Sequence, residues 1–143
     1  MGECIFCKII KGEIPAAKVY EDENVLAFLD IAPASKGHTL VIPKEHHELI
    51  SDVPNEKLEK AIDVVKMLGQ ALLKDNDGFN VMQNNKRAAG QLVPHVHFHV
   101  IPRKNDDGLD VAQWKSTKYE EGEMEKVREK LMNLLAQAAV GHN

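Results

Sequence analysis

In residues 94–102, Pro-His-Val-His-Phe-His-Val-Ile-Pro, three histidines alternate strictly with apolar residues. Alternation with a period of two is typical of a β-strand, so His95, His97 and His99 are predicted on one face and apolar residues on the other. A half-buried strand with a solvated polar face would explain one or two histidines. Three of the chain's seven histidines on one face favour a functional site.

Four other stretches have the composition of strands, and they are residues 18–21, 25–31, 38–42 and 79–84. The stretch 25–31 is apolar along most of its length, with Asp30 as the exception. Short, turn-like connections join several of these stretches. The pattern therefore favours an antiparallel α+β domain over a parallel one.

Three stretches are predicted as helices. A short helix lies within residues 4–12, and a longer one begins at an Asp52 cap, with Pro54 in its first turn, and ends at Asp77-Gly78. A last helix begins at about Glu120. The two longer helices each have one apolar stripe, spaced at three and four residues: Leu58, Ala61, Ile62, Val65, Leu68 and Leu72 in the first, and Met124, Val127, Leu131, Leu134, Leu135 and Ala138 in the second.

Composition is ordinary for a globular protein, with 43% hydrophobic and 28% charged residues. The net charge of −4 and the lack of a basic segment argue against broad nucleic-acid binding. No apolar run is long enough for a membrane span, and the first residues do not resemble a signal peptide. We therefore predict one cytoplasmic domain over residues 1–143, with no nucleic-acid or membrane partner.

Cys4 and Cys7 form a C-x-x-C pair, which supplies half of a tetrahedral zinc site. A redox role would require a βαβ context that the chain lacks. Candidates for the remaining ligands are His46, His47 and one histidine of the 94–102 stretch. Two buried cysteines without a role are the alternative, which spacing alone leaves open.

Polar residues near the histidine stretch are candidates for ligand binding. Gly90 lets backbone approach a ligand closely, and Gln91 and Asn84 carry amides that can donate to phosphate oxygens or ribose hydroxyls. Asp30 can accept hydrogen bonds from a sugar diol. Each signal is weak alone, because loop amides are common and Asp30 could cap the following turn.

Taken together, these residues resemble the histidine triad (HIT) family. The stretch His95-Val96-His97-Phe98-His99-Val100 is similar to the family's motif of alternating histidines. Four further segments look like family segments in family order, over about residues 3–103: Ile5–Ile10, Phe28–Ile31, His38–Pro43 and Gly90-Gln91. Residues 104–143 would form a variable, helical C-terminal tail.

The resemblance implies an α+β, HIT-like fold with a five-stranded antiparallel sheet and two main helices. It also implies a homodimer in which two sheets join into one. The implied activity is that of a hydrolase or transferase acting on the α-phosphate of a purine nucleotide or nucleotide conjugate. A nucleoside monophosphate would be released through a nucleotidyl-histidine intermediate.

The resemblance also assigns roles to residues. His97 would attack phosphorus, His99 and His38 would stabilise charge beside the phosphate, and Gln91 would hold phosphate oxygens. Asp30 would bind the ribose hydroxyls. The implied nucleotide-binding residues are Phe6, Ile9, Phe28, Leu29, Asp30, Ile31, Asn84, Gln91, His97 and His99.

In a bacterial-type subset of the family, the C-x-x-C pair binds zinc with two histidines. The matching ligands here are Cys4, Cys7, His46 and His95. Two thiolates and two imidazoles make a closed site, so this zinc would be structural. It would connect the N-terminal segment to the stretch that carries His97.

One position departs from the family. Many members have Ser or Thr after the Gly-Gln pair, where a hydroxyl can assist the leaving group, and this chain has Leu92. Implied substrates are nucleoside phosphoramidates, which we favour, aminoacyl-adenylates and dinucleoside polyphosphates. Leu92 keeps open a non-enzymatic nucleotide sensor or scaffold. A metallohydrolase with one metal on His95, His97 and His99 is the third hypothesis, although three alternating ligands on one strand would require strain.

Overall fold

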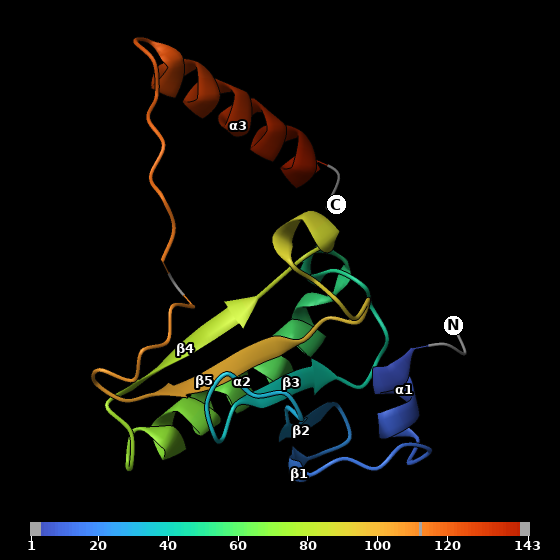
Figure 1. The fold of residues 1–143 in the computed structure, drawn as a ribbon. Coiled ribbons are helices and arrows are strands. Elements are labelled where there is room, and N and C mark those ends of the chain that lie inside the picture. The colour runs from blue at the N-terminus through green and yellow to red at the C-terminus, as the bar shows by residue number, and fades with distance from the viewer. Residues whose placement is uncertain (1–3, 112, 141–143) are drawn as a thin grey trace. The chain divides into compact units, whose positions relative to one another are not determined.

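A computed structural model of the chain describes residues 4–111 and 113–140. The chain divides into two compact units, Met1–Leu109 and Asp110–Asn143. The first unit contains a five-stranded sheet in the order β1-β2-β3-β5-β4, in which all neighbouring strands are antiparallel (Figure 1). The predicted antiparallel α+β fold is confirmed.

Four strands lie where the sequence predicts them, with small shifts at their ends, whereas β5 begins later than predicted. Strand β5 lies between β3 and β4, and its His99 is paired with Leu40 on one side and Met82 on the other. His99 is therefore held inside the sheet. The strand bounds are β1 Lys18–Glu21, β2 Val25–Leu29, β3 Thr39–Pro43, β4 Gly78–Gln83 and β5 Phe98–Arg103.

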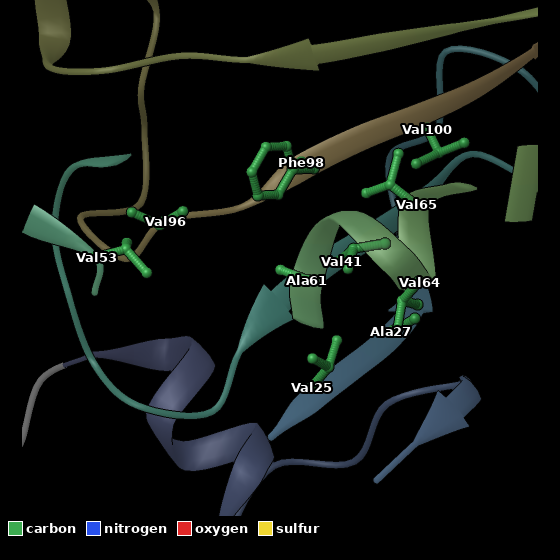
Figure 2. Close-up of a cluster of buried hydrophobic side chains, with 10 residues drawn as sticks. All are labelled: Val25, Ala27, Val41, Val53, Ala61, Val64, Val65, Val96, Phe98 and Val100. Atoms are coloured by element: carbon green, nitrogen blue, oxygen red, sulfur yellow. The ribbon is translucent and has the colours of Figure 1, made fainter. Parts of the chain in front are cut away.

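One face of the sheet packs against helix α2 (Asn55–Leu72). Every second residue of the central strands points to this side, so β-branched and aromatic residues at those positions meet the apolar stripe of the helix. Figure 2 shows the resulting cluster: Val25, Ala27, Val41, Val53, Ala61, Val64, Val65, Val96, Phe98 and Val100. Because this core covers one face of β5, a functional site formed by β5 side chains must lie on the opposite face.

The opposite face is covered in part by the short helix α1 (Ile5–Ile10). Phe6 and Ile9 of this helix pack against alternate residues of β2 and β3, which are Leu26, Phe28, Leu40 and Ile42. Because Phe98 and Val100 point toward α2, His97 and His99 point toward the α1 face. The predicted site therefore lies on the side of the sheet that α1 covers.

The predicted strand of histidines is only partly correct. Strand β5 begins at Phe98, so His95 and His97 precede it and only His99 belongs to it. The backbone N–H of Val96 donates to the carbonyl of His47, a loop residue, at 2.8 Å. The alternation of side chains nevertheless continues, because Val96 joins the same core cluster as Phe98.

The prediction for the long helix is wrong at both ends. Asp52 belongs to a 3₁₀ turn over Ile50–Asp52, and Pro54 is the N-cap of α2 without a side-chain cap. At the other end, the Asn76 side chain donates to the carbonyl of Leu72, and the chain leaves the helix there rather than at residues 77–78. Within the predicted stripe, Ile62 is exposed.

The second unit contains helix α3 (Glu123–Val140), which begins three residues after the predicted start. The backbone N–H of Glu120 donates to the carboxylate of Glu123 at 2.8 Å, which is one of the two bonds of a capping box. The single-domain organisation predicted for the whole chain stays a prediction. Among the described residues, no helix combines the length and apolar character that a membrane crossing needs.

Candidate active site and metal centre

A cavity of about 380 Å³ opens on the α1 face of the sheet. Eight of the predicted nucleotide-binding residues line it: Phe6, Ile9, Phe28, Leu29, Asp30, Ile31, His97 and His99. The rest of the lining is mostly apolar and consists of Ile5, Ile14, Pro15, Ala16, Ala32, Leu40, Gly90, Leu92 and Val93. An apolar cavity with a few polar groups at one side is typical of a small-molecule site.

His97 is oriented by its own strand segment. Its Nδ1 lies 2.7 Å from the carbonyl oxygen of His95. A carbonyl can only accept, so Nδ1 carries the proton and the lone pair is on Nε2. Burial lowers the pKa of His97, against the raising effect of the His95 carbonyl, which favours the neutral ring. Phe6 packs edge-on against this ring, with centroids 5.2 Å apart.

His99 lies next to His97 in the cavity wall, and His38 lies beside His99. The rings of His97 and His99 lie 5.0 Å apart, and His38 Nε2 lies 2.9 Å from His99 Nδ1. Burial lowers the pKa of His99 to about 4, and it also lowers the pKa of His38. His38 is 5% exposed and stands behind His99 rather than in the cavity wall.

Asp30 caps the following turn and also lines the cavity, while ribose binding by its carboxylate stays a prediction. One carboxylate oxygen accepts from the backbone N–H of Ala32 at 2.9 Å and so caps the turn after β2. The other lies 3.7 Å from His38 Nε2. Among the described residues that line the cavity, Asp30 is the only one that carries a carboxylate, amine or guanidinium group.

Gln91 and Asn84 do not line this cavity. The Gln91 side chain is 6% exposed, donates to the carbonyls of Glu48 (2.7 Å) and Val93 (3.1 Å), and accepts from the N–H of Lys86 (2.7 Å). These bonds hold the loop that ends in the cavity wall. Direct phosphate binding by Gln91 or Asn84 therefore stays a prediction.

A second cluster lies beside the first. The Sγ atoms of Cys4 and Cys7 and one nitrogen each of His46 and His95 all lie within 4.8 Å of one another. The closest pairs are His46 Nδ1 to His95 Nδ1 (3.1 Å), Cys7 to His46 (3.3 Å) and Cys4 to His95 (3.4 Å). With Zn–S bonds of about 2.3 Å and Zn–N bonds of about 2.0 Å, the edges of a tetrahedron measure about 3.3 to 3.8 Å.

The protonation of His95 and Cys7 also fits a metal ion. His95 Nε2 lies 2.8 Å from the carbonyl of Pro43 and must donate to it, so Nδ1 turns a lone pair toward the cluster. Burial lowers the pKa of His95 to about 4, which keeps the ring neutral. Burial and the neighbouring Cys4 raise the pKa of Cys7. Two thiolates so close together therefore require a cation that they share. The four residues therefore fit a closed zinc site.

Two other sequence hypotheses do not match this arrangement. His47 points to Glu45, at 2.7 Å, and is absent from the four-residue cluster. Among the described residues, His95 and His99 belong to different groups of metal-ligating side chains, and His97 belongs to neither. One metal on all three histidines is therefore not supported.

Sequence reasoning missed two groups that orient the imidazoles. These are the N–H of Ala34, which donates to His38 Nδ1 at 3.0 Å, and the carbonyl of Pro43, which lies 2.8 Å from His95 Nε2. Both are backbone atoms, so no residue type marks them in a sequence. For His97 the resemblance implies a backbone carbonyl as partner, and the carbonyl of His95 lies 2.7 Å from its Nδ1. The lining by Leu40 and Val93 was missed as well.

The fold and the site define a small antiparallel α+β domain that presents an imidazole lone pair to a ligand in an apolar cavity. The HIT domain family model matches residues 11–106, which is two thirds of the chain. The chain therefore belongs to the HIT family.

Similar proteins support this assignment. A Schizosaccharomyces pombe protein named adenosine 5′-monophosphoramidase is 51% identical over 114 residues, covering 79% of this chain and 84% of the relative. The crystal structure of a Bacillus subtilis HIT family member has a TM-score of 0.83 at 43% identity, over 92% and 96% of the two chains. A zinc-bound histidine triad protein from Mycobacterium smegmatis has a TM-score of 0.74 at 37% identity, over 95% and 98%.

Proposed function

We propose that this protein is a nucleotide hydrolase or transferase that releases a nucleoside monophosphate from a nucleotide conjugate. The bond cleaved is P–N or P–O at the α-phosphate, and the substrate classes are phosphoramidates, aminoacyl-adenylates and dinucleoside polyphosphates. The observation that carries the proposal is the His97 Nδ1 to His95 carbonyl contact of 2.7 Å beside the cavity. The relative named adenosine 5′-monophosphoramidase supports the same chemistry.

Each residue of the site has a separate role in the proposed reaction. Phe6, Ile9 and Phe28 enclose a purine base in the apolar part of the cavity. Asp30 accepts hydrogen bonds from the ribose hydroxyls. His97 Nε2 attacks phosphorus, and its ring, which becomes cationic, donates Nδ1–H to the His95 carbonyl throughout. Water then attacks the nucleotidyl-histidine and restores the neutral ring.

Quenched-turnover mass spectrometry tests this proposal. Wild-type protein stopped during turnover of a nucleoside phosphoramidate should carry one nucleotidyl group on His97. His97→Ala should lose turnover and the adduct while still binding adenosine monophosphate in calorimetry. Full activity of His97→Ala would refute the proposal.

Leu92 favours a second candidate, a nucleotide sensor without turnover. Its side chain is 88% exposed in the cavity wall and offers no hydrogen bond to a leaving group. This candidate predicts tight binding of nucleoside monophosphates with no adduct from any of the three substrate classes. The same mass spectrometry experiment distinguishes the two.

We further propose that a structural zinc ion is held by Cys4, Cys7, His46 and His95. This ion would cross-link α1 to the segment before β5. The zinc-bound relative supports this assignment. Purified protein should contain one zinc per chain, and Cys7→Ser should lower both zinc content and thermal stability. A purified protein without zinc that is equally stable would contradict it.

We also propose a homodimer in which two sheets join. Strand β4 is an edge of the sheet, and Val81 near its middle is 48% exposed. An open edge offers backbone groups to a second copy. Light scattering should give twice the mass of the 143-residue chain, and a monomer at micromolar concentration would exclude this dimer.

A further inference from the structure

Cys4 and Cys7 lie close enough to form a disulfide bond with each other. Cys4 is the N-cap of helix α1 and Cys7 lies in its first turn, where the backbone N–H of Cys7 is 3.4 Å from Cys4 Sγ. Residues three apart in a helical turn are neighbours on its surface. The two Sγ atoms lie within 4.8 Å of each other. Rotation of the two side chains can close this distance, so the pair can be oxidised without unfolding α1.

The two thiols differ in their access to solvent. The Cys7 side chain is partly exposed, whereas Cys4 is buried in the apolar cluster beneath α1. A small oxidant in solution therefore reaches Cys7 first, and Cys4 is the resolving thiol beside it. An accessible thiol next to a resolving cysteine is common in redox-sensing sites. The chain has two cysteines, so no third thiol competes for this bond within one molecule.

A change at these cysteines reaches the residues that orient His97. The Sγ atoms of Cys4 and Cys7 lie 3.4 and 3.6 Å from His95 Nδ1, and the carbonyl of His95 lies 2.7 Å from His97 Nδ1. Phe6, between the two cysteines in the sequence, packs edge-on against both imidazole rings, with centroids 5.9 Å from His95 and 5.2 Å from His97. The position of His97 therefore depends on the cysteines through one carbonyl and one aromatic ring.

We propose that Cys4 and Cys7 form a redox modification site, in which oxidation by a peroxide releases the zinc ion and displaces the imidazole of His97. The inference rests on the proposed function, because it uses both the zinc ligands and the attack by His97. Unlike the dithiol of an oxidoreductase, this pair transfers no electrons to a second protein. Its oxidation changes the geometry of the same molecule and slows nucleotide turnover.

The oxidation consumes one hydrogen peroxide and has two steps. A cysteine that ligates zinc does so as a thiolate, which is the form that peroxides oxidise. The Cys7 thiolate takes one oxygen atom as the O–O bond breaks, which gives a sulfenic acid and a hydroxide ion. Cys4 then attacks the sulfenic sulfur, so the S–S bond forms, the S–O bond breaks and a second hydroxide leaves. Solvent protons convert both hydroxides to water. The sulfurs have lost two electrons, and His46 and His95 alone do not retain the metal.

Hydrogen peroxide treatment of the zinc-loaded protein tests the proposal. Trypsin cleaves after Lys8, so both cysteines fall in the peptide of residues 1–8, which should become lighter by two hydrogen atoms. Zinc should appear on a chelating dye, and the imidazole ¹⁵N signals of His97 should shift. The single-turnover rate of nucleotidyl-His97 formation should fall roughly tenfold, because small misplacements of a nucleophile are costly. Dithiothreitol followed by zinc should restore all four readouts, whereas methionine sulfoxide needs a dedicated reductase.

Two controls separate the disulfide from the loss of metal. Cys7→Asp keeps an oxygen ligand for zinc and cannot form the disulfide, so peroxide should change its zinc content and its adduct rate by less than about twofold. Removal of zinc from the reduced wild-type protein with a chelator needs no substitution. It should reproduce the shifted His97 signals and the slower adduct formation, while circular dichroism shows that the sheet remains folded.

Three results would overturn the inference. They are a peptide of residues 1–8 that keeps both thiols after peroxide treatment, oxidised protein that retains its zinc, and His97 signals that are unchanged after oxidation. Loss of zinc from peroxide-treated Cys7→Asp would refute the part assigned to the disulfide. Failure of the proposed function gives a different result, because the reduced, zinc-loaded protein would then form no His97 adduct. The peptide mass, the released zinc and the ¹⁵N signals would still decide whether the modification site exists.

Discussion

Replacing Gln91 with alanine tests whether this residue acts through the loop before His95 rather than through the phosphate. Its amide is almost fully buried and makes three hydrogen bonds to backbone groups of Lys86, Glu48 and Val93. Lys86 has φ 69° and ψ 166°, a backbone conformation that residues other than glycine rarely adopt. The Gln91 amide therefore holds together a strained loop.

The expected cost follows from the groups that the substitution leaves unpaired. The Lys86 N–H and the Glu48 carbonyl lose this partner, whereas the Val93 carbonyl still accepts from the N–H of His95. Each group left unpaired costs about 1 kcal/mol or more. Water reaches part of this loop, because Lys86 and Glu48 are exposed. We therefore expect the free energy of unfolding to fall by about 2–4 kcal/mol, which corresponds to a drop in melting temperature of roughly 6–12 °C.

Urea unfolding followed by far-ultraviolet circular dichroism measures this loss. Fluorescence is unsuitable, because the only tryptophan, Trp114, lies in the second unit. Gln70→Ala, an exposed glutamine of α2, is the control and should change stability by less than about 0.5 kcal/mol. If Gln91→Ala unfolds like wild type but loses turnover, Gln91 acts on the substrate and the loop argument is refuted.

Three further outcomes are expected. Gly69→Ala should lower stability by about 1–3 kcal/mol, because its new Cβ would overlap the ring of Phe79, whereas Gly78→Ala has free space around it and serves as the control in urea unfolding. Lys86→Gly should be more stable than Lys86→Ala by about 1 kcal/mol in the same assay, because glycine tolerates the backbone conformation at this position; a less stable glycine variant would argue against strain. The pKa of His99 is about 4 in the folded protein and near the ordinary 6.5 in the unfolded chain. Between pH 4 and pH 6.5 the unfolded chain therefore binds more protons than the folded protein. The free energy of unfolding should fall as the pH drops from 6.5 to 4. In His99→Gln the fall should be smaller, and an identical pH profile would contradict the assignment.

The two clusters of the protein share one residue. The His95 side chain faces the cysteines, while its carbonyl accepts from the ring of His97. Phe6 lies between Cys4 and Cys7 in the sequence and packs against both histidines. A metal ion bound by these cysteines would therefore stiffen the same segment that aims His97.

Sequence patterns predicted much of this arrangement because they record short-range geometry. Alternation over residues 94–102 gave the correct faces, and the five strands and α2 appear close to the predicted ranges. The C-x-x-C spacing indicated half of a tetrahedral zinc site, and the resemblance added His46 and His95, which the structure places beside both cysteines. Helix ends were predicted poorly, because the Asn76 contact that ends α2 has no simple pattern.

Only the tertiary structure decided how the three alternating histidines differ. They look equivalent in the sequence, yet His95 faces two cysteines, His97 lines the cavity and His99 lies 2.9 Å from the ring of His38. The groups that separate them are backbone atoms of Ala34 and Pro43, residues far away in the chain. Every residue carries such a carbonyl, and every residue except proline carries such an N–H. Only the folded chain therefore determines which backbone group lies beside which imidazole ring.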